Sequence, residues 1–174
     1  MGRDKAWLPY RGTTLAEHLA RAVQEAAGTV ALVGDPARYA SFGYPVYRDK
    51  FPGCGPLGGI YTALDITSAD WNLIVACDMP GISVEILRTL LNCATELDGT
   101  SCIVAAGPGG EPEPLCAVYH RNCLPVLARA IQEKRFKMKD LIAELVTQMV
   151  PVDGSVLANA NTPAEWAAFA EKPK

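Results

Sequence analysis

An aspartate follows a continuously apolar run of the chain, where its side chain could do chemistry. Residues 73–77 (Leu-Ile-Val-Ala-Cys) lead directly into Asp78, which is followed by Met and Pro. A carboxylate fixed at the end of a buried strand is suited to hold Mg²⁺ against a phosphate. Aspartates also shape turns and cap helices at such junctions, so the residues alone leave both roles open.

A glycine-rich segment lies upstream of that aspartate. Residues 53–59 read Gly-Cys-Gly-Pro-Leu-Gly-Gly. Glycines let main-chain N–H groups approach a ligand closely, and the N-terminus of a following helix favours anions or the edge of a base. This density of glycines favours a ligand loop over a plain connecting turn. Asp49, just before the loop, could accept hydrogen bonds from a guanine base or could simply be solvated.

Further candidates lie near the two ends of the sequence. Lys5 could neutralise a phosphate oxygen or stand in solvent. Asn159 and Asn161 could bind a polar heterocycle or form turns. Arg135 and Lys137 belong to a small basic cluster, for which a solvated face and a phosphate contact are both open. We take Lys137 as a candidate substrate contact.

These residues need elements to position them, and helical and strand-like patterns alternate along the chain. Thr14 to Glu17 reads as a capping box that starts a helix ending before Gly28. Strands separated by helices favour parallel pairing, and parallel sheets bind ligands at the carboxyl ends of their strands. We therefore expect the segments that follow the strands to build the site. The expected strands are 30–33, 45–47, 73–77, 102–106, 115–119 and 149–152, and the further helices are 60–66, 83–97, 124–132, 138–145 and 162–171, with 52–59 as a loop.

The bulk composition fits one α/β domain over residues 1–174 and argues against several other classes. Hydrophobic residues make up 49% and charged residues 20%, which excludes a disordered tail protein. A net charge of -3 argues against a nucleic-acid partner and an anionic membrane. No apolar run nears the roughly 20 residues that span a bilayer, and no signal-peptide pattern opens the chain.

The six cysteines predict buried, reduced thiols. None forms a C-x-x-C pair, and Cys77, Cys102 and Cys116 lie in apolar, strand-like runs. A zinc site or a disulfide scaffold is therefore not expected. Reduced thiols predict a cytoplasmic location.

Taken together, these segments resemble the molybdenum cofactor guanylyltransferase family. The matching pieces are residues 1–5, Asp49, 53–59, 77–80 and 159–163, in the family's order and approximate spacing. The resemblance covers nearly the whole chain. The G-P-L-x-G loop and the N-x-N-T-P segment are the parts that best distinguish this family from others. It implies a Rossmann-like, three-layer α/β/α nucleotidyltransferase fold, with a mostly parallel sheet and a small antiparallel element.

The resemblance also implies an activity and residue roles. That family transfers GMP from GTP to molybdopterin and releases pyrophosphate, with Mg²⁺ as cofactor. GTP and molybdopterin would be the substrates, while transient contact with molybdoenzymes or cofactor-delivery proteins stays open. The implied roles are GTP contact for Lys5, guanine binding for Asp49, Mg²⁺ ligation for Asp78, loop glycines for Gly55 and Gly59, pterin contact for Asn159 and Asn161, and, at Gly34, the position of a nucleotide-binding asparagine in the family.

The sequence departs from the family at its start. The family motif L-A-G-G-x-S-x-R-M-G-x-D-K is matched only from its methionine, which is Met1 here. The first strand and the glycine-rich phosphate loop of the family would lie upstream, so we expect the domain to be N-terminally incomplete as numbered. Each buried main-chain group left unpaired beside that strand would cost about 1–3 kcal/mol.

Other functions remain open at this stage. The same fold could transfer CMP to the pterin, or a nucleotide to a sugar phosphate. A non-catalytic relative that binds a nucleotide or cofactor is the third alternative. Retention of Lys5, Asp49 and Asp78 favours an enzyme over a binding protein.

Overall fold

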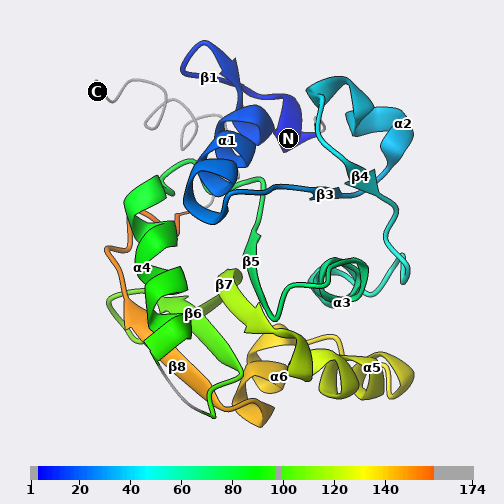
Figure 1. Cartoon of the computed structure of the whole chain (residues 1–174), viewed down its shortest axis with the longest axis vertical. Coiled ribbons are helices and arrows are strands. Elements are labelled where there is room, and N and C mark those ends of the chain that lie inside the picture. The colour runs from blue at the N-terminus through cyan, green and yellow to red at the C-terminus, as the bar shows by residue number, and fades with distance from the viewer. Residues whose placement is uncertain (1–3, 97–98, 159–174) are drawn as a thin grey trace.

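A mixed sheet lies between two layers of helices in the computed structural model, which describes residues 4–96 and 99–158 (Figure 1). The strands are β1 (Pro9–Tyr10), β2 (Thr13–Thr14), β3 (Leu32–Val33), β4 (Val46–Tyr47), β5 (Trp71–Val75), β6 (Cys102–Ala106), β7 (Pro112–His120) and β8 (Thr147–Pro151). The α-helices are α1 (Leu15–Ala27), α2 (Pro36–Tyr39), α3 (Pro56–Ile66), α4 (Val84–Glu96), α5 (Leu124–Gln132) and α6 (Met138–Glu144), with short 3₁₀ helices η1 (Lys5–Trp7), η2 (Ala40–Phe42) and η3 (Arg121–Cys123).

The main sheet has the strand order β5-β7-β6-β8. Strand β7 runs antiparallel to both β5 and β6, whereas β6 and β8 are parallel. The reversal of β7 follows from its connection, because Gly110 N–H donates to Gly107 O at 2.8 Å and closes a tight turn after β6. The parallel pair β3 and β4 forms a separate small sheet.

Each face of the main sheet packs against its own helix layer. On one face, Leu19 of α1 and Leu87 of α4 pack with Ile103 of β6. On the other face, Ile60 of α3 packs with the neighbouring strand residue Val104 and with α5 and α6. Successive strand residues point to opposite faces, so a strand covered on both sides is apolar throughout. The predicted three-layer α/β/α architecture is found (Figure 1). The prediction of a mostly parallel sheet was wrong for the described main sheet, because β7 is antiparallel to both of its neighbours and only β6 and β8 are parallel.

Helix α1 shows why this part of the fold could be predicted. Thr14 Oγ1 accepts from Glu17 N–H at 3.3 Å, and the Glu17 carboxylate accepts from Thr14 N–H at 3.0 Å. This reciprocal pair is the predicted capping box. Gly28, in the left-handed region at φ 79°, ends the helix as predicted.

Two element boundaries differ from the prediction in ways that affect the site. Helix α3 begins at Pro56, inside the segment predicted as a loop, because proline at the first helical turn has its φ already set for a helix. Strand β5 ends at Val75, so Cys77 and Asp78 lie beyond the ladder. Helix 162–171 lies outside the described residues.

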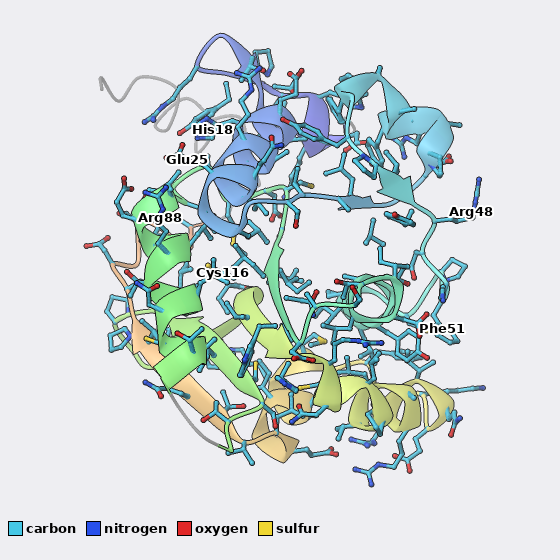
Figure 2. All side chains as sticks on the ribbon, viewed as in Figure 1. His18, Glu25, Arg48, Phe51, Arg88 and Cys116 are labelled. Atoms are coloured by element: carbon cyan, nitrogen blue, oxygen red, sulfur yellow. The ribbon has the colours of Figure 1, made fainter. Side chains whose placement is uncertain are left out.

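The prediction of buried thiols is confirmed for three of the six cysteines, Cys102, Cys116 and Cys123, whereas Cys54 and Cys93 are partly exposed. All six thiols are free, and Cys102 and Cys116 are buried as expected. Figure 2 shows Cys116 in the interior, beside α4. The expectation for Cys77 was wrong: it is exposed, because it follows the end of β5.

Within the described residues, no helix has the length and apolar character needed to cross a bilayer.

Candidate active site

The centre of the site is an ion pair between the first short helix and the end of β5. Lys5 Nζ lies 3.0 Å from Asp78 Oδ2, although the two residues are 73 positions apart. Each side chain is 26% exposed, so the pair is within reach of a ligand from solvent. The structure thus brings together the two residues predicted to carry the chemistry.

The turn that carries Asp78 is held from two sides. The buried hydroxyl of Tyr10 donates to Pro80 O at 2.8 Å, and Met79 is buried. Gly81 approaches the segment 153–158 so closely that a Cβ there would lie 2.6 Å from Ser155 O. The carboxylate therefore projects from a fixed turn, which is the pre-organisation that an electrostatic role requires.

A second set of contacts fixes the helix that carries Lys5. Asp4 caps η1 by accepting from Ala6 N–H at 3.1 Å. The other oxygen of Asp4 accepts from the Tyr39 hydroxyl at 2.7 Å and pairs with Arg38 at 2.9 Å. Burial, and then this bond to Asp4, raise the pKa of Tyr39 to about 12, so the hydroxyl remains a donor. Sequence inspection gave neither Asp4 nor Tyr39 a role, since their partnership spans 35 positions.

Because Gly34 has no side chain, it leaves space for the ring of Tyr39. A Cβ at this position would lie 2.7 Å from the ring of Tyr39. The ring is thus seated directly against the main chain that follows β3. This contact gives Gly34 a packing role, and its predicted nucleotide contact stays a prediction.

The glycine-rich loop has a conformation that needs glycine. Gly53 and Gly55 have φ values of 93° and 60°, in the region that side chains disfavour. Gly55 is the N-cap of α3 and supplies no side-chain cap. The first N–H groups of α3 are therefore available to a ligand, and the dipole of this helix favours an anion there.

Asp49 holds this loop against α3. Its Oδ1 accepts from Phe51 N–H at 2.9 Å and from the Thr62 hydroxyl at 3.3 Å. Thr62 is buried and accepts in turn from Lys50 N–H at 3.0 Å. Figure 2 shows Phe51 beside α3. Asp49 thus has a structural role in the loop, while guanine binding stays a prediction.

A cleft of about 370 Å³ is lined by parts of η1, β3, α3 and β5. Its walls include Ala6 of η1, Tyr39, and Pro56 and Gly59 at the start of α3. They also include Cys77, the residue before Asp78. It lies between β3 and β5, which belong to separate sheets, and it includes residues at the carboxyl end of β5, where α/β folds commonly bind ligands.

Glu113, near the start of β7, is a further acidic residue that the sequence analysis missed. Its pKa is raised mainly by burial and also by the charge of Asp78, and Lys139 opposes this effect. The ladder explains the proximity, since Val75 pairs with Cys116 and Ala76 N–H donates to Leu115 O. Because β7 is antiparallel to β5, its early residues lie beside the end of β5. The direction of β7 was the information that the sequence lacked.

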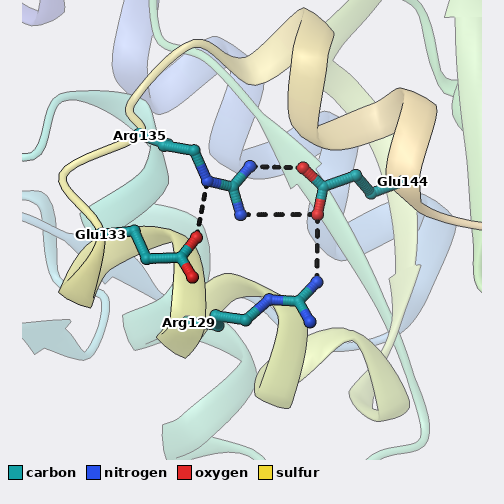
Figure 3. Close-up of polar contacts among 4 residues, drawn as sticks. All are labelled: Arg129, Glu133, Arg135 and Glu144. Carbon is teal, nitrogen blue, oxygen red and sulfur yellow. Dashed lines mark hydrogen bonds and ion pairs between the residues drawn. The ribbon is translucent and has the colours of Figure 1, made fainter.

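Within the basic cluster, Arg135 is paired with carboxylates. Figure 3 shows the Arg135 guanidinium bonded to Glu133 and Glu144, and Arg129 bonded to the same Glu144. Arg135 therefore has carboxylate partners already. Lys137 is exposed at the N-cap of α6, and its predicted substrate contact stays a prediction.

The predicted pterin contacts, Asn159 and Asn161, lie outside the described residues. Segment 153–158 packs against the turn after Asp78 at Gly81.

The fold and this site define the class. A solved structure with a TM-score of 0.80 and 23% identity, molybdopterin-guanine dinucleotide biosynthesis protein A from Archaeoglobus fulgidus, covers 98% of this chain and 90% of its own. A second, Rv0371c from Mycobacterium tuberculosis H37Rv in complex with manganese, has a TM-score of 0.70 and 21% identity over 98% of this chain and 94% of its own. At such identities the likeness shows the fold, which is that of the nucleotidyltransferases.

The sequence comparisons narrow the class to one family. The MobA-like NTP transferase domain matches residues 1–167, and the chain belongs to this family. The probable molybdenum cofactor guanylyltransferase of Carboxydothermus hydrogenoformans is 32% identical over 95% of this chain and 86% of that protein. The chain is thus a nucleotidyltransferase, and the resemblance noted in its sequence is confirmed.

Proposed function

We propose that this enzyme transfers GMP from GTP to molybdopterin and releases pyrophosphate, in the cytoplasm. The observation that carries the proposal is the pair of Lys5 and Asp78 at 3.0 Å, beside a cleft bounded by the start of α3. Relatives that match nearly the whole chain carry the name of this activity. GTP and molybdopterin are the proposed substrates.

The reaction needs charge to be placed and neutralised. A terminal phosphate oxygen of molybdopterin attacks the α-phosphorus of GTP, and the bond from that phosphorus to the β-phosphate oxygen breaks. No covalent enzyme intermediate is required, so positioning and electrostatic stabilisation supply the catalysis. Lys5 offsets the negative charge that develops on the departing pyrophosphate. The hydrogen bond between Asp4 and Tyr39 keeps η1, the short helix that carries Lys5, in place.

The donor set suits a magnesium ion. Within residues 4–96 and 99–158 no group of three or more His, Cys, Asp or Glu could hold a metal, but Mg²⁺ is commonly held by one or two carboxylates together with substrate phosphates. Asp78 is the carboxylate proposed for this ligation. When bound, the ion supplies Lewis acidity and charge neutralisation at the phosphates.

The glycine loop and Asp49 are proposed to select guanine. Asp49 Oδ1 already accepts from the loop, and the second carboxylate oxygen is the group proposed to accept from the base. Lys137, Asn159 and Asn161 are the proposed contacts to molybdopterin, and Gly34, Gly55 and Gly59 are proposed to lie along the nucleotide. Binding of GTP and CTP measured side by side with Mg²⁺ tests the base preference, and tighter binding of CTP would contradict it.

Turnover of GTP and molybdopterin, followed by pyrophosphate release, tests the catalytic assignment. Asp78→Ala is expected to lower turnover by about 10²–10³, the scale for losing one pre-organised electrostatic group. The matched control is Glu25→Gln, which removes an exposed ion pair with Arg88, 3.3 Å long, between α1 and α4 (Figure 2). Near-normal turnover of Asp78→Ala, or an equal loss in the control, would show that this pair is not the catalytic centre.

A further inference from the structure

Glu113 lies beside the candidate active site, at a place where β7 departs from a regular ladder. Val104 of β6 pairs with Ala117, whereas the next residue of β6, Ala105, pairs with Glu113. Residues 114–116 therefore form a bulge opposite β6. Bulges of this kind redirect side chains and are common next to active sites.

Two hydrogen bonds hold this bulge in a defined conformation. The buried hydroxyl of Tyr119 donates to Pro114 O at 2.9 Å, and Leu115 N–H donates to Glu113 Oε1 at 3.2 Å. Among the residues that the structure describes, no other donor is bonded to the Glu113 carboxyl group. The side chain is half-buried, and its second oxygen, Oε2, is therefore able to bind a ligand.

The ladder between β5 and β7 sets Glu113 beside Asp78. Ala76 N–H donates to Leu115 O at 2.8 Å and continues the antiparallel pairing of the two strands. A step forward along one antiparallel strand matches a step backward along the other, so Asp78 is at the level of Glu113. In agreement with this placement, the charge of Asp78 acts on the Glu113 carboxyl group and, after burial, helps to raise its pKa.

The two carboxylates are neutralised unequally by their neighbours. Lys5, from η1, pairs with Asp78 Oδ2 at 3.0 Å. The cation that acts on Glu113 is Lys139, which is 64% exposed and also pairs with Glu111 at 3.7 Å. Two carboxylates near each other disfavour their charged forms unless a cation is bound beside them. The arrangement therefore favours a further positive charge next to Glu113.

We infer that Glu113 is a second carboxylate ligand of the divalent cation and binds the ion together with Asp78. This inference rests on the proposed function and adds a ligand to its metal site. Magnesium is commonly held by one or two carboxylates together with water and substrate phosphates. A cation bound here also relieves the repulsion between the two side chains. With two charged ligands, the protein binds the ion before a nucleotide arrives, so binding is measurable with the ion alone.

Manganese binding to the protein without nucleotide, followed by the electron paramagnetic resonance signal of the unbound ion, tests this inference. Mn²⁺ accepts the same oxygen ligands as Mg²⁺. Glu113→Gln removes the charge and keeps an oxygen that can accept from Leu115 N–H, so the bulge retains its hydrogen bond. The dissociation constant for manganese is expected to rise by about tenfold or more, the scale for losing a group that supports a metal site.

The matched control is Glu111→Gln, which removes a charge from the same hairpin at an exposed position. Its manganese affinity is expected to stay close to that of the parent protein. Without metal, Glu113→Gln is expected to melt at or above the parent Tm, because it removes a half-buried charge beside Asp78. An equal loss of affinity in the control, or an unchanged affinity in Glu113→Gln, would overturn the inference. A Tm of Glu113→Gln well below that of the parent would also overturn it, by assigning the carboxylate to the bulge.

A third variant, Asp78→Asn, separates this inference from the proposed function. Weaker manganese binding in Asp78→Asn but not in Glu113→Gln would leave the proposed magnesium ligand in place and exclude Glu113 from the site. Unchanged binding in both variants would contradict the magnesium assignment itself. If Glu113→Gln binds manganese normally but has a higher KM for molybdopterin, Glu113 contacts the substrate and the inference is wrong.

Discussion

Gly58 and Gly59 are adjacent in α3 but have different surroundings, so substitutions at the two positions test packing and ligand approach separately. A Cβ on Gly58 would lie 2.6 Å from Phe51 O and 2.9 Å from Asp49 Oδ1, whereas a Cβ on Gly59 would have nothing within 4 Å. Both residues lie in the first turns of the same helix. The substitutions Gly58→Ala and Gly59→Ala therefore make the same chemical change in opposite environments.

The structure gives the expected magnitudes. In Gly58→Ala the closest atom belongs to the main chain, so helix and loop must separate, and overpacking of this kind costs about 1–3 kcal/mol. For a chain of this size, each kcal/mol lowers Tm by about 2–4 °C. In Gly59→Ala the added methyl group meets no atom, and replacing a helical glycine by alanine stabilises by about 0.5–1 kcal/mol.

Thermal unfolding and nucleotide titration together test this reasoning. Gly58→Ala is expected to melt several degrees below the parent protein, and Gly59→Ala at or above it. If Gly59 lies against the nucleotide, its variant binds GTP more weakly although it is more stable. Unchanged stability of Gly58→Ala, or a larger loss in Gly59→Ala, would refute the packing argument.

Other predictions concern groups around the site and on the surface. Tyr39→Phe, which removes the donor to the cap of η1, is expected to lower turnover about fivefold, the worth of one hydrogen bond; unchanged kinetics would contradict this. Hydrogen bonds from Thr13 and then Thr14 lower the pKa of Glu17 from 4.5 to about 2, so its stabilising contribution is complete above the unfolded value and is lost as pH falls towards 2. Urea midpoints of Glu17→Gln should therefore vary less with pH in that window than those of the parent. Arg135→Ala should shift Tm by less than about 2 °C, since its ion pairs are exposed, and a larger shift would show that the cluster in Figure 3 is structural.

The features predicted well depend on neighbours in sequence. The capping box at Thr14 and the stop at Gly28 are local, and both are found where expected. Residues 102–106 were predicted as a strand and form β6. Local chemistry is sufficient for such elements because it determines them directly. The prediction that the apolar run 73–77 is a buried strand was wrong, because β5 is half-buried at the edge of the main sheet and is antiparallel to β7.

The features that were missed depend on tertiary neighbours. The role of Asp4 needs Tyr39 beside it, and Glu113 approaches the site only because β7 is reversed. In the same way, the different surroundings of Gly58 and Gly59 are invisible in a run of two glycines, and only the position of Asp49 distinguishes them. Candidate residues could thus be named from type and order, while the contacts that hold them required the fold.

The turn after Asp78 is secured by segments from distant parts of the gene product. Tyr10 holds it through Pro80, and residues near Ser155 press against it at Gly81. During synthesis, the second of these supports leaves the ribosome well after Asp78 itself. A nascent chain therefore has the aspartate before it has both of the contacts that fix the turn, and substrates meet the complete site only after the segment around Ser155 has folded against Gly81.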